Sequence, residues 1–275
     1  MLDKVEVRTD QGSLLTLSLQ NSFGGITVQD IEGLDPVKAT MVSSTMAQLD
    51  GEQYQTSRRE KRNIIFTLGF DPDYVNTSVD SLRKRLYTFF MPKSRVMLRF
   101  FPEGEDPVDI IGRVESFDSP KFTRDPLTTI SVLCFEPDFY DPTPTILSGT
   151  TVGNTLETTH VYSGTVETGI NFRLMVNRSL SAFTIHHRPG DGSLRTFEFA
   201  VASPLVSGDV VRVSTVPGSK FVNVLRSSVI LPYLHAVTPQ SNWISLFPGT
   251  NKLRIFAEGA GIPYEIEYTT KFGGL

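Results

Sequence analysis

Short segments in which apolar and polar residues alternate recur along the whole chain of 275 residues, and they constrain its fold more than any other feature. Such alternation places one face of an extended segment on a core and the other in water, which is typical of a β-strand. The clearest example is Leu15-Thr16-Leu17-Ser18-Leu19. Other expected strands cover residues 5–8, 62–68, 95–101, 108–117, 127–135, 171–176, 183–188, 194–199, 210–213, 221–224, 252–255 and 263–268. The sequence therefore predicts a mainly β protein.

One segment, from about Ser78 to Phe90, has the spacing of an amphipathic helix instead. Its apolar residues recur at intervals of three and four: Val79, Leu82, Leu86 and Phe89. Asn76 or Ser78 can accept the first free backbone N–H groups, and Pro92 prevents the helix from continuing. The first part of the chain is thus expected to be a sheet that carries one helix.

A proline-rich stretch from Glu136 to Pro144 separates two parts of different composition. Residues 1–142 contain 16 Lys and Arg against 22 Asp and Glu, a net charge of −6, whereas residues 143–275 carry +2. Prolines keep the backbone extended and cannot donate to a sheet, which suits a linker. We predict two domains, 1–142 and 143–275. The second is expected to be a β-sandwich, because it shows short strands, regular turns and no helical pattern.

Composition excludes several classes of protein. The overall net charge of −4 is wrong for a generally basic nucleic-acid coat. A single cysteine, Cys134, cannot form an intrachain disulfide or a cysteine-rich zinc site. The first residues lack the basic-then-apolar pattern of a signal peptide, and no segment approaches the ~20 apolar residues that a membrane helix needs. We therefore expect no membrane insertion.

The search for catalytic motifs favours a protein that is not an enzyme. The sequence contains no His-Glu-x-x-His, no Gly-x-Ser-x-Gly and no glycine-rich phosphate loop. His186 and His187 are neighbours in an expected strand, so they face opposite sides and do not share a metal, and Cys134 is expected in the core. Two carboxylates about 5–9.5 Å apart could still make a glycoside hydrolase, but the second part holds few acids. We predict no catalytic residue, cofactor or metal.

Two basic clusters are the first candidate sites. They comprise Arg58, Arg59, Lys61 and Arg62, and then Arg83, Lys84 and Arg85. A nucleic-acid site would need a continuous basic stripe with stacking aromatics, whereas these cations lie in the part whose net charge is −6. Pairing with acids of the same domain or of a neighbouring subunit fits better, so we interpret them as a possible interface between subunits and predict no sequence-specific nucleic acid.

Trp243 is the only tryptophan and has two interpretations. An exposed ring on a β-sandwich could stack on a sugar. However, Trp243 stands beside Ile244, Leu246 and Phe247 just before a Pro-Gly turn, a setting that favours a buried anchor.

The order of the motifs resembles that of the distal tail proteins (Dit) of long-tailed, non-contractile bacteriophages. From about Leu49 onward the motifs are, in order, Arg58 to Phe70, Leu82-Arg83-Lys84-Arg85-Leu86-Tyr87, Arg95 to Phe100, Gly112 to Ser116, Pro126 to Cys134, Glu136 to Asp141, Gly208-Asp209-Val210-Val211, Pro217 to Lys220, and Trp243 with Leu246 to Asn251. Two places depart from the family. Cys134 is followed by Phe135-Glu136-Pro137 rather than a Cys-x-Asp-Pro-like exit, and residues 36–48 look like a specific arm or loop.

The resemblance implies an N-terminal belt domain followed by a galectin-like or carbohydrate-binding-module-like sandwich. It implies a structural virion protein, made in the host cytoplasm, whose belt domains form a homohexameric ring at the distal end of the tail. The expected partners are other copies of the chain, the tail tube protein and the baseplate hub or tail-associated protein. The alternative is a module that binds host glycans through the sandwich and Trp243.

Overall fold

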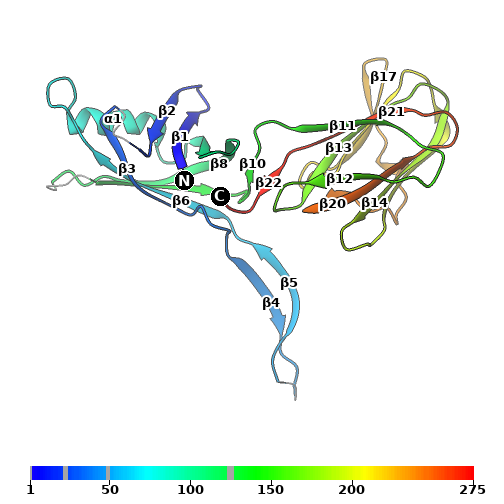
Figure 1. The fold of residues 1–275 in the computed structure, drawn as a ribbon, viewed down its shortest axis with the longest axis horizontal. Coiled ribbons are helices and arrows are strands. Elements are labelled where there is room, and N and C mark those ends of the chain that lie inside the picture. Colours follow the sequence, from blue (N-terminus) through cyan, green and yellow to red (C-terminus); the bar gives the residue numbers. More distant parts are fainter. Residues whose placement is uncertain (1, 21–23, 48–49, 123–126) are drawn as a thin grey trace. The chain divides into compact units, whose positions relative to one another are not determined.

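The computed structural model describes residues 2–20, 24–47, 50–122 and 127–275. They form two compact units. The first unit contains Met1–Pro142 and also Phe272–Leu275, and the second contains Thr143–Lys271. The chain therefore leaves the first unit after Pro142 and returns to it at Phe272, so the last four residues belong with the first unit (Figure 1). The independent folding of 1–142 and 143–275 stays a prediction.

The first unit is built on a nine-stranded antiparallel sheet. Its main path runs β2-β1-β7-β8-β9-β6-β3, with β10 beside β8 and β22 beside β10. The strands are β1 (Leu2–Thr9), β2 (Leu14–Ser18), β3 (Ile26–Glu32), β6 (Arg62–Phe70), β7 (Arg95–Pro102), β8 (Val108–Asp118), β9 (Leu127–Cys134), β10 (Phe139–Tyr140) and β22 (Lys271–Phe272). Apolar residues at alternate positions of β6 and β7 are buried, as the sequence pattern predicts.

One helix, α1 (Val79–Phe89), packs on this sheet, and its prediction is confirmed. Ser78 is the N-cap: its hydroxyl accepts the Ser81 N–H, and the Ser81 hydroxyl in turn accepts the Ser78 N–H. Leu82, Leu86 and Phe89 are buried in the core of the unit. The helix therefore closes one side of a single apolar core.

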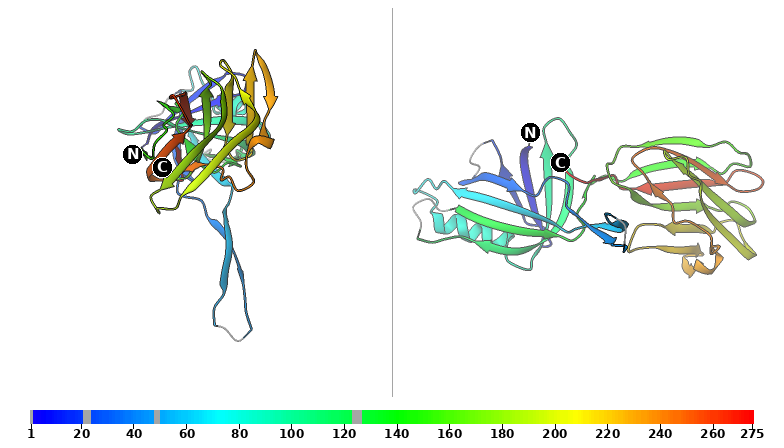
Figure 2. Two further views of the ribbon diagram at one scale, coloured as in Figure 1. Left: turned by 90° about the vertical axis from the view of Figure 1, so that its right-hand side faces the viewer. Right: turned by 90° about the horizontal axis from the view of Figure 1, so that it is seen from below.

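Between β3 and β6 the chain forms a separate two-stranded hairpin of β4 (Ala39–Ser44) and β5 (Gln53–Arg59), which we call the arm. Two views show it extending away from the sheet of the first unit (Figures 1 and 2). Strand β5, which is absent from the strands expected from the sequence, lies between Gly51 and β6. Residues 39–44, within the segment interpreted as an arm or loop, form a strand.

The second unit is a β-sandwich, as predicted. One sheet runs β11-β21-β13-β16-β17-β18, with β19 beside β13, and the other runs β12-β20-β14-β15. The strands are β11 (Thr145–Thr150), β12 (Thr158–Tyr162), β13 (Thr168–Met175), β14 (Leu180–Pro189), β15 (Arg195–Leu205), β16 (Val210–Ser214), β17 (Phe221–Arg226), β18 (Val229–Pro232), β19 (Ser245–Leu246), β20 (Gly249–Phe256) and β21 (Pro263–Tyr268), with a short 3₁₀ turn, η1 (Leu234–Ala236).

Aromatic residues from both sheets fill the core of the sandwich. Phe172 of β13 lies 5.6 Å from Phe183 of β14, and Phe183 stacks on Phe199 of β15 at 5.0 Å, measured between ring centroids. The strands expected at residues 183–188 and 194–199 pair as a hairpin, β14 and β15, in which Phe183 and Phe199 are cross-strand partners. In the described part of the chain, no helix has the length and apolar character that crossing a membrane requires.

Candidate assembly surface

The arm exposes large apolar side chains and has almost no core of its own. All seven residues of β5 are exposed. Met41 and Tyr54 are 64% and 61% exposed. The Tyr54 hydroxyl lies 2.8 Å from that of Ser57, the cross-strand partner of Met41, so Met41 and Tyr54 share one face of the hairpin. An isolated two-stranded hairpin is marginally stable in water, and exposed apolar groups mark interaction surfaces. The arm is therefore the first candidate for contact with another molecule.

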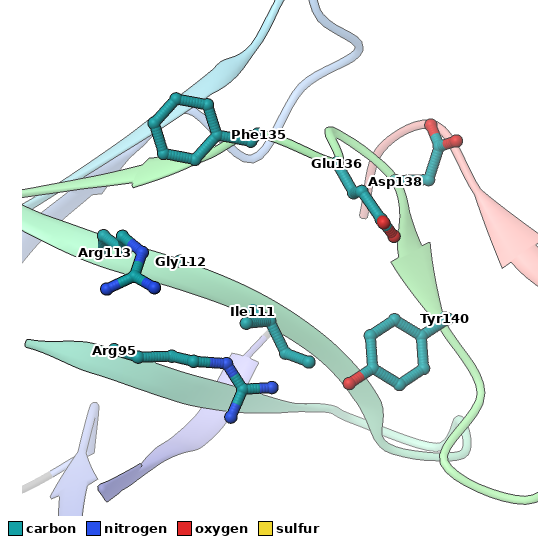
Figure 3. Close-up of a pocket in the computed structure, with 8 residues that line it drawn as sticks. All are labelled: Arg95, Ile111, Gly112, Arg113, Phe135, Glu136, Asp138 and Tyr140. Carbon is teal, nitrogen blue, oxygen red and sulfur yellow. The ribbon is translucent and has the colours of Figure 1, made fainter. Parts of the chain in front are cut away.

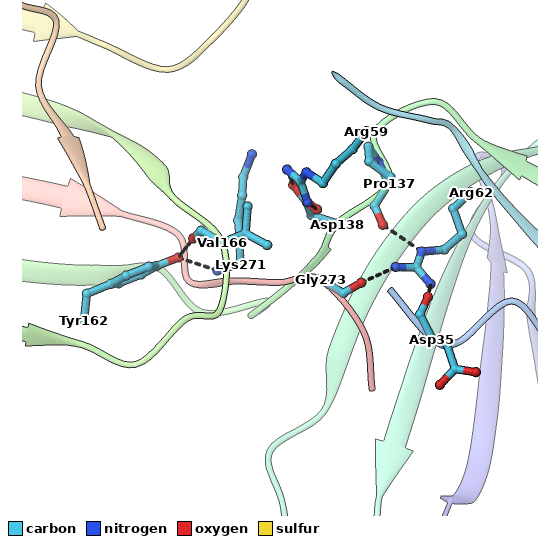
Figure 4. Close-up of polar contacts among 9 residues, drawn as sticks. All are labelled: Asp35, Arg59, Arg62, Pro137, Asp138, Tyr162, Val166, Lys271 and Gly273. Atoms are coloured by element: carbon cyan, nitrogen blue, oxygen red, sulfur yellow. Dashed lines mark hydrogen bonds and ion pairs between the residues drawn. The ribbon is translucent and has the colours of Figure 1, made fainter. Parts of the chain in front are cut away.

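A buried arginine holds the arm root, by which we mean residues 33–36 before β4 and 59–62 after β5. The Arg62 side chain is 1% exposed, and its guanidinium carbon, Cζ, lies 4.4 Å from the Phe139 ring centroid. It donates four hydrogen bonds to backbone carbonyls, which belong to Gly33 (2.5 Å), Asp35 (2.7 Å), Pro137 (2.7 Å) and Gly273 (2.6 Å). Three of these contacts appear in Figure 4.

These bonds explain how a buried cation is tolerated without a bonded carboxylate. Burial lowers the pKa of Arg62, but arginine remains charged in proteins, so the carbonyl dipoles must replace its water. Gly33 completes the arrangement. Its φ is +86°, and a Cβ there would lie 1.9 Å from the Asn63 carbonyl oxygen, so only glycine fits.

The end of β5 is tied to the segment that leads out of the first unit. The Arg59 guanidinium binds both carboxylate oxygens of Asp138, one of them at 2.9 Å. Such a forked pair fixes direction as well as distance. Phe272–Leu275, which we call the tail, contacts the other side of the root, where the Leu275 N–H donates to the Leu34 carbonyl at 3.1 Å.

A hollow of about 300 Å³ lies in the first unit, and Asp138, the partner of Arg59, is among the residues that line it (Figure 3). Its lining residues are Arg95, Ile111, Gly112, Arg113, Phe135, Glu136, Asp138 and Tyr140. Figure 3 shows Arg95 and Arg113 on one side and Glu136 and Tyr140 on the other. Tyrosine is neutral at neutral pH, and burial raises the pKa of the Tyr140 phenol further above its ordinary value. Opposite charges around the 65% exposed Phe135 ring suit contact with a protein surface better than with a singly charged ligand.

The structure separates the basic residues that were predicted as an interface. Arg58, Lys61, Lys84 and Arg85 are exposed, and Arg59 is bound to Asp138. Arg62 and Arg83 are buried, so the expectation of a possible interface between subunits does not hold for these two side chains as exposed groups. Arg83 donates to the Ser119 hydroxyl and to the Pro120 carbonyl within the first unit. A role of the exposed cations between subunits stays a prediction.

The structure also places the two neighbouring histidines and the cysteine that were named from the sequence. His187 is fully buried and bonds the Asn251 side chain at 2.9 Å, whereas His186 is half-buried on the opposite face, as predicted. Cys134 is buried in the core, as predicted, and burial raises the pKa of its thiol to about 12. Among the described residues, no three His, Cys, Asp or Glu side chains are grouped to hold a metal ion.

Trp243 is half-buried and packs against the core of the sandwich. Its ring centroid lies 5.9 Å from that of Phe197, and Lys220 Nζ lies 5.4 Å from it. This favours the anchor interpretation, while glycan stacking stays a prediction that this placement does not test.

Replacing Trp243 with alanine should therefore destabilise the second unit. We expect a loss of about 2 kcal/mol, below the usual range for a fully buried aromatic because the ring keeps some exposure. Urea unfolding followed by circular dichroism measures the loss, and Trp243→Phe, which retains most of the contacts, is the control. Unchanged stability in the alanine variant would contradict the anchor role.

Sequence reasoning missed the arm's second strand, the Arg62 contacts and the tail. The second strand could have been suspected from Tyr54, the one aromatic residue in the otherwise polar segment from Gln53 to Arg59. No local signal identifies the tail contacts, because Gly273 lies 211 residues from Arg62 along the chain.

Comparison with known proteins finds a family model that matches part of the chain and solved structures of similar fold. Residues 163–272 match the family model described as siphovirus-type tail component, C-terminal domain. The fold is similar to the crystal structure of SPP1 Dit (gp 19.1), described as a paradigm of hub adsorption apparatus in phages that infect Gram-positive bacteria. The TM-score is 0.68 at 20% identity, covering 98% of this chain and 99% of that one.

A second similar structure comes from the phage P2 baseplate in its activated conformation with Ca, with a TM-score of 0.46 at 12% identity, covering 97% of this chain and 98% of that one. No curated protein sequence matches. The resemblance to distal tail proteins is thus confirmed by sequence over residues 163–272 and by fold over nearly the whole chain.

Proposed function

We propose that the protein is a non-catalytic distal tail adaptor that forms a hexameric ring and joins the tail tube to the baseplate hub at the distal end of the virion tail. The family match and the Dit-like fold support a tail component. The stoichiometry and the two partners are those that the resemblance implies.

The exposed arm is the observation that supports ring formation. A hairpin with Met41 and Tyr54 exposed on one face gains stability when a neighbouring subunit covers that face. A ring of identical subunits closes through contacts between two different surfaces of each chain. The arm is one such surface, and it projects from the unit that also carries the mixed-charge hollow.

Light scattering on the purified full chain tests this proposal. We expect the mass of about six chains of 30.6 kDa each. The double variant Met41→Ser, Tyr54→Ser should shift the population to monomer, with an association constant lowered at least about 100-fold, because it removes two apolar anchors from the contact.

The matched control removes equally exposed apolar groups from the second unit. Leu194 and Val161 are 54% and 65% exposed, and the double variant Leu194→Ser, Val161→Ser should leave the mass unchanged. A wild-type chain that stays monomeric at high concentration would contradict the ring. A ring that survives loss of Met41 and Tyr54 would show that the arm does not carry it.

A further inference from the structure

The tail lies in the first unit although the second unit precedes it in the chain. Two of its backbone groups bond the arm root, through which the chain enters and leaves the arm. The Gly273 carbonyl accepts a bond from Arg62, the Leu275 N–H donates to the Leu34 carbonyl, and a Cβ on Gly274 would lie 2.8 Å from Pro36 Cδ. Phe272 packs against the core of the first unit.

Arg62 links the tail to the arm root. The same guanidinium that binds Gly273 also binds the carbonyls of Gly33 and Asp35. The entry of the arm is therefore held by the tail directly through Leu34 and indirectly through Arg62. Without the tail, Leu34 loses its hydrogen bond from Leu275 and Arg62 loses one of its four bonds.

Hydrogen bonds within the second unit hold Lys271, the residue that precedes the tail. Strands β11 and β21 pair, with Thr145 opposite Tyr268, so the entry and exit of this unit are adjacent. The Tyr162 hydroxyl accepts the Lys271 N–H at 2.8 Å (Figure 4). The Thr165 N–H donates to the Lys271 carbonyl at 3.0 Å. Lys271 is thus fixed one residue before the tail begins.

Folding of the second unit changes how easily the tail can dock. When that unit is unfolded, roughly 130 residues form a flexible loop between Pro142 and Phe272, and closing such a loop has a large entropic cost. Once it is folded, the paired β11 and β21 strands hold the ends of the loop together, which raises the effective concentration of the tail.

We infer that the tail is a latch that fixes the arm for assembly only after the second unit has folded. Domains generally fold from the N-terminus during synthesis, so the first unit would otherwise present its arm early. The latch makes subunit association depend on a folded second unit. This inference rests on the proposed role of the arm in ring formation, and it identifies folding of the second unit as the event that regulates ring formation.

Gly274→Val in the full chain tests the latch, because the new side chain would displace the tail from Pro36. Hydrogen exchange read by mass spectrometry on residues 33–44 and 53–60 reports the arm root directly, including the Glu60 N–H that donates to the Lys38 carbonyl. We expect exchange there to accelerate about tenfold and the association constant of the ring to fall about tenfold.

Gly153→Val is the matched control, since a Cβ at Gly153 meets no atom within 4 Å. It should change neither readout. Unchanged exchange and association in Gly274→Val would overturn the latch. A monomeric wild type would overturn the ring, and the latch would then be tested by hydrogen exchange at the arm root alone.

Tyr162→Phe keeps the inference testable if Gly274→Val fails to fold. It removes a hydroxyl in the second unit that holds Lys271 and makes no change in the first unit. We expect faster exchange at residues 33–36 from this change too. If exchange rises only within the second unit, the coupling that defines the latch is absent.

Discussion

Replacing Arg62 with alanine is expected to lower the free energy of unfolding of the first unit by about 4 kcal/mol, because four backbone carbonyls lose their shared donor in a buried place. The side chain is 1% exposed, and the carbonyls come from the arm root, the exit segment and the tail. Its removal also leaves a cavity beside Phe139, which adds to the loss. Urea unfolding followed by circular dichroism measures the change.

Two further variants test whether the geometry of Arg62 matters more than its charge and whether its burial matters. Arg62→Lys keeps the positive charge, but a single ammonium cannot bond four carbonyls in different directions, so most of the loss should remain. Arg59→Ala removes a neighbouring arginine whose side chain is 41% exposed, and it should cost no more than about 1 kcal/mol. An Arg62→Ala variant as stable as Arg59→Ala would refute the role of Arg62 as the anchor of the root.

Replacing Asp209 with alanine is expected to destabilise the second unit by about 3 kcal/mol. The Asp209 carboxylate is 1% exposed and accepts two bonds from Arg226, at 2.8 and 2.6 Å, and a third from the Val206 N–H at 2.9 Å. The loss leaves the Val206 N–H unpaired and removes the forked ion pair. Glu265→Ala is the control, since the Arg173–Glu265 pair is exposed and 3.7 Å long, and it should cost about 0.5 kcal/mol or less.

The same carboxylate should make stability depend on acid pH. Hydrogen bonds from Arg226 lower the pKa of Asp209 below its ordinary value, so folding favours the ionised form. Its contribution is complete above the unfolded pKa, near 4, and disappears as the pH falls below that value towards the folded pKa. Unfolding between pH 7 and pH 2.5 should therefore show a larger loss for the wild type than for Asp209→Asn. Parallel pH curves for the two proteins would contradict this assignment.

Sequence patterns predicted those elements whose stabilising residues lie close to one another along the chain. The apolar spacing from Val79 to Phe89 and the hydroxyl of Ser78 are enough to define α1 and its N-cap. The alternation on either side of Pro189-Gly190-Asp191-Gly192 predicts the β14–β15 hairpin, because its turn and its buried face lie within a few residues of one another.

The candidate site was predicted less well, because its residues are brought together over long sequence separations. A run such as Arg58 to Arg62 suggests a solvated surface, yet Arg62 is buried by carbonyls from three distant segments. The arm was suspected at residues 36–48, but β5 carries no apolar alternation facing a core, because all its residues are exposed. A fragment that ends at residue 142 would lack the tail contacts altogether.

The sequence by itself determined the fold class, the single helix and the resemblance to distal tail proteins, since each follows from periodicities and motifs of neighbouring residues. Tertiary structure alone decided which cations are buried, and it alone placed Phe272–Leu275 in the first unit. The physical reason is that burial of a charge depends on donors and acceptors far away in the chain. For Arg62 those acceptors are four carbonyls that only the folded chain brings to one guanidinium.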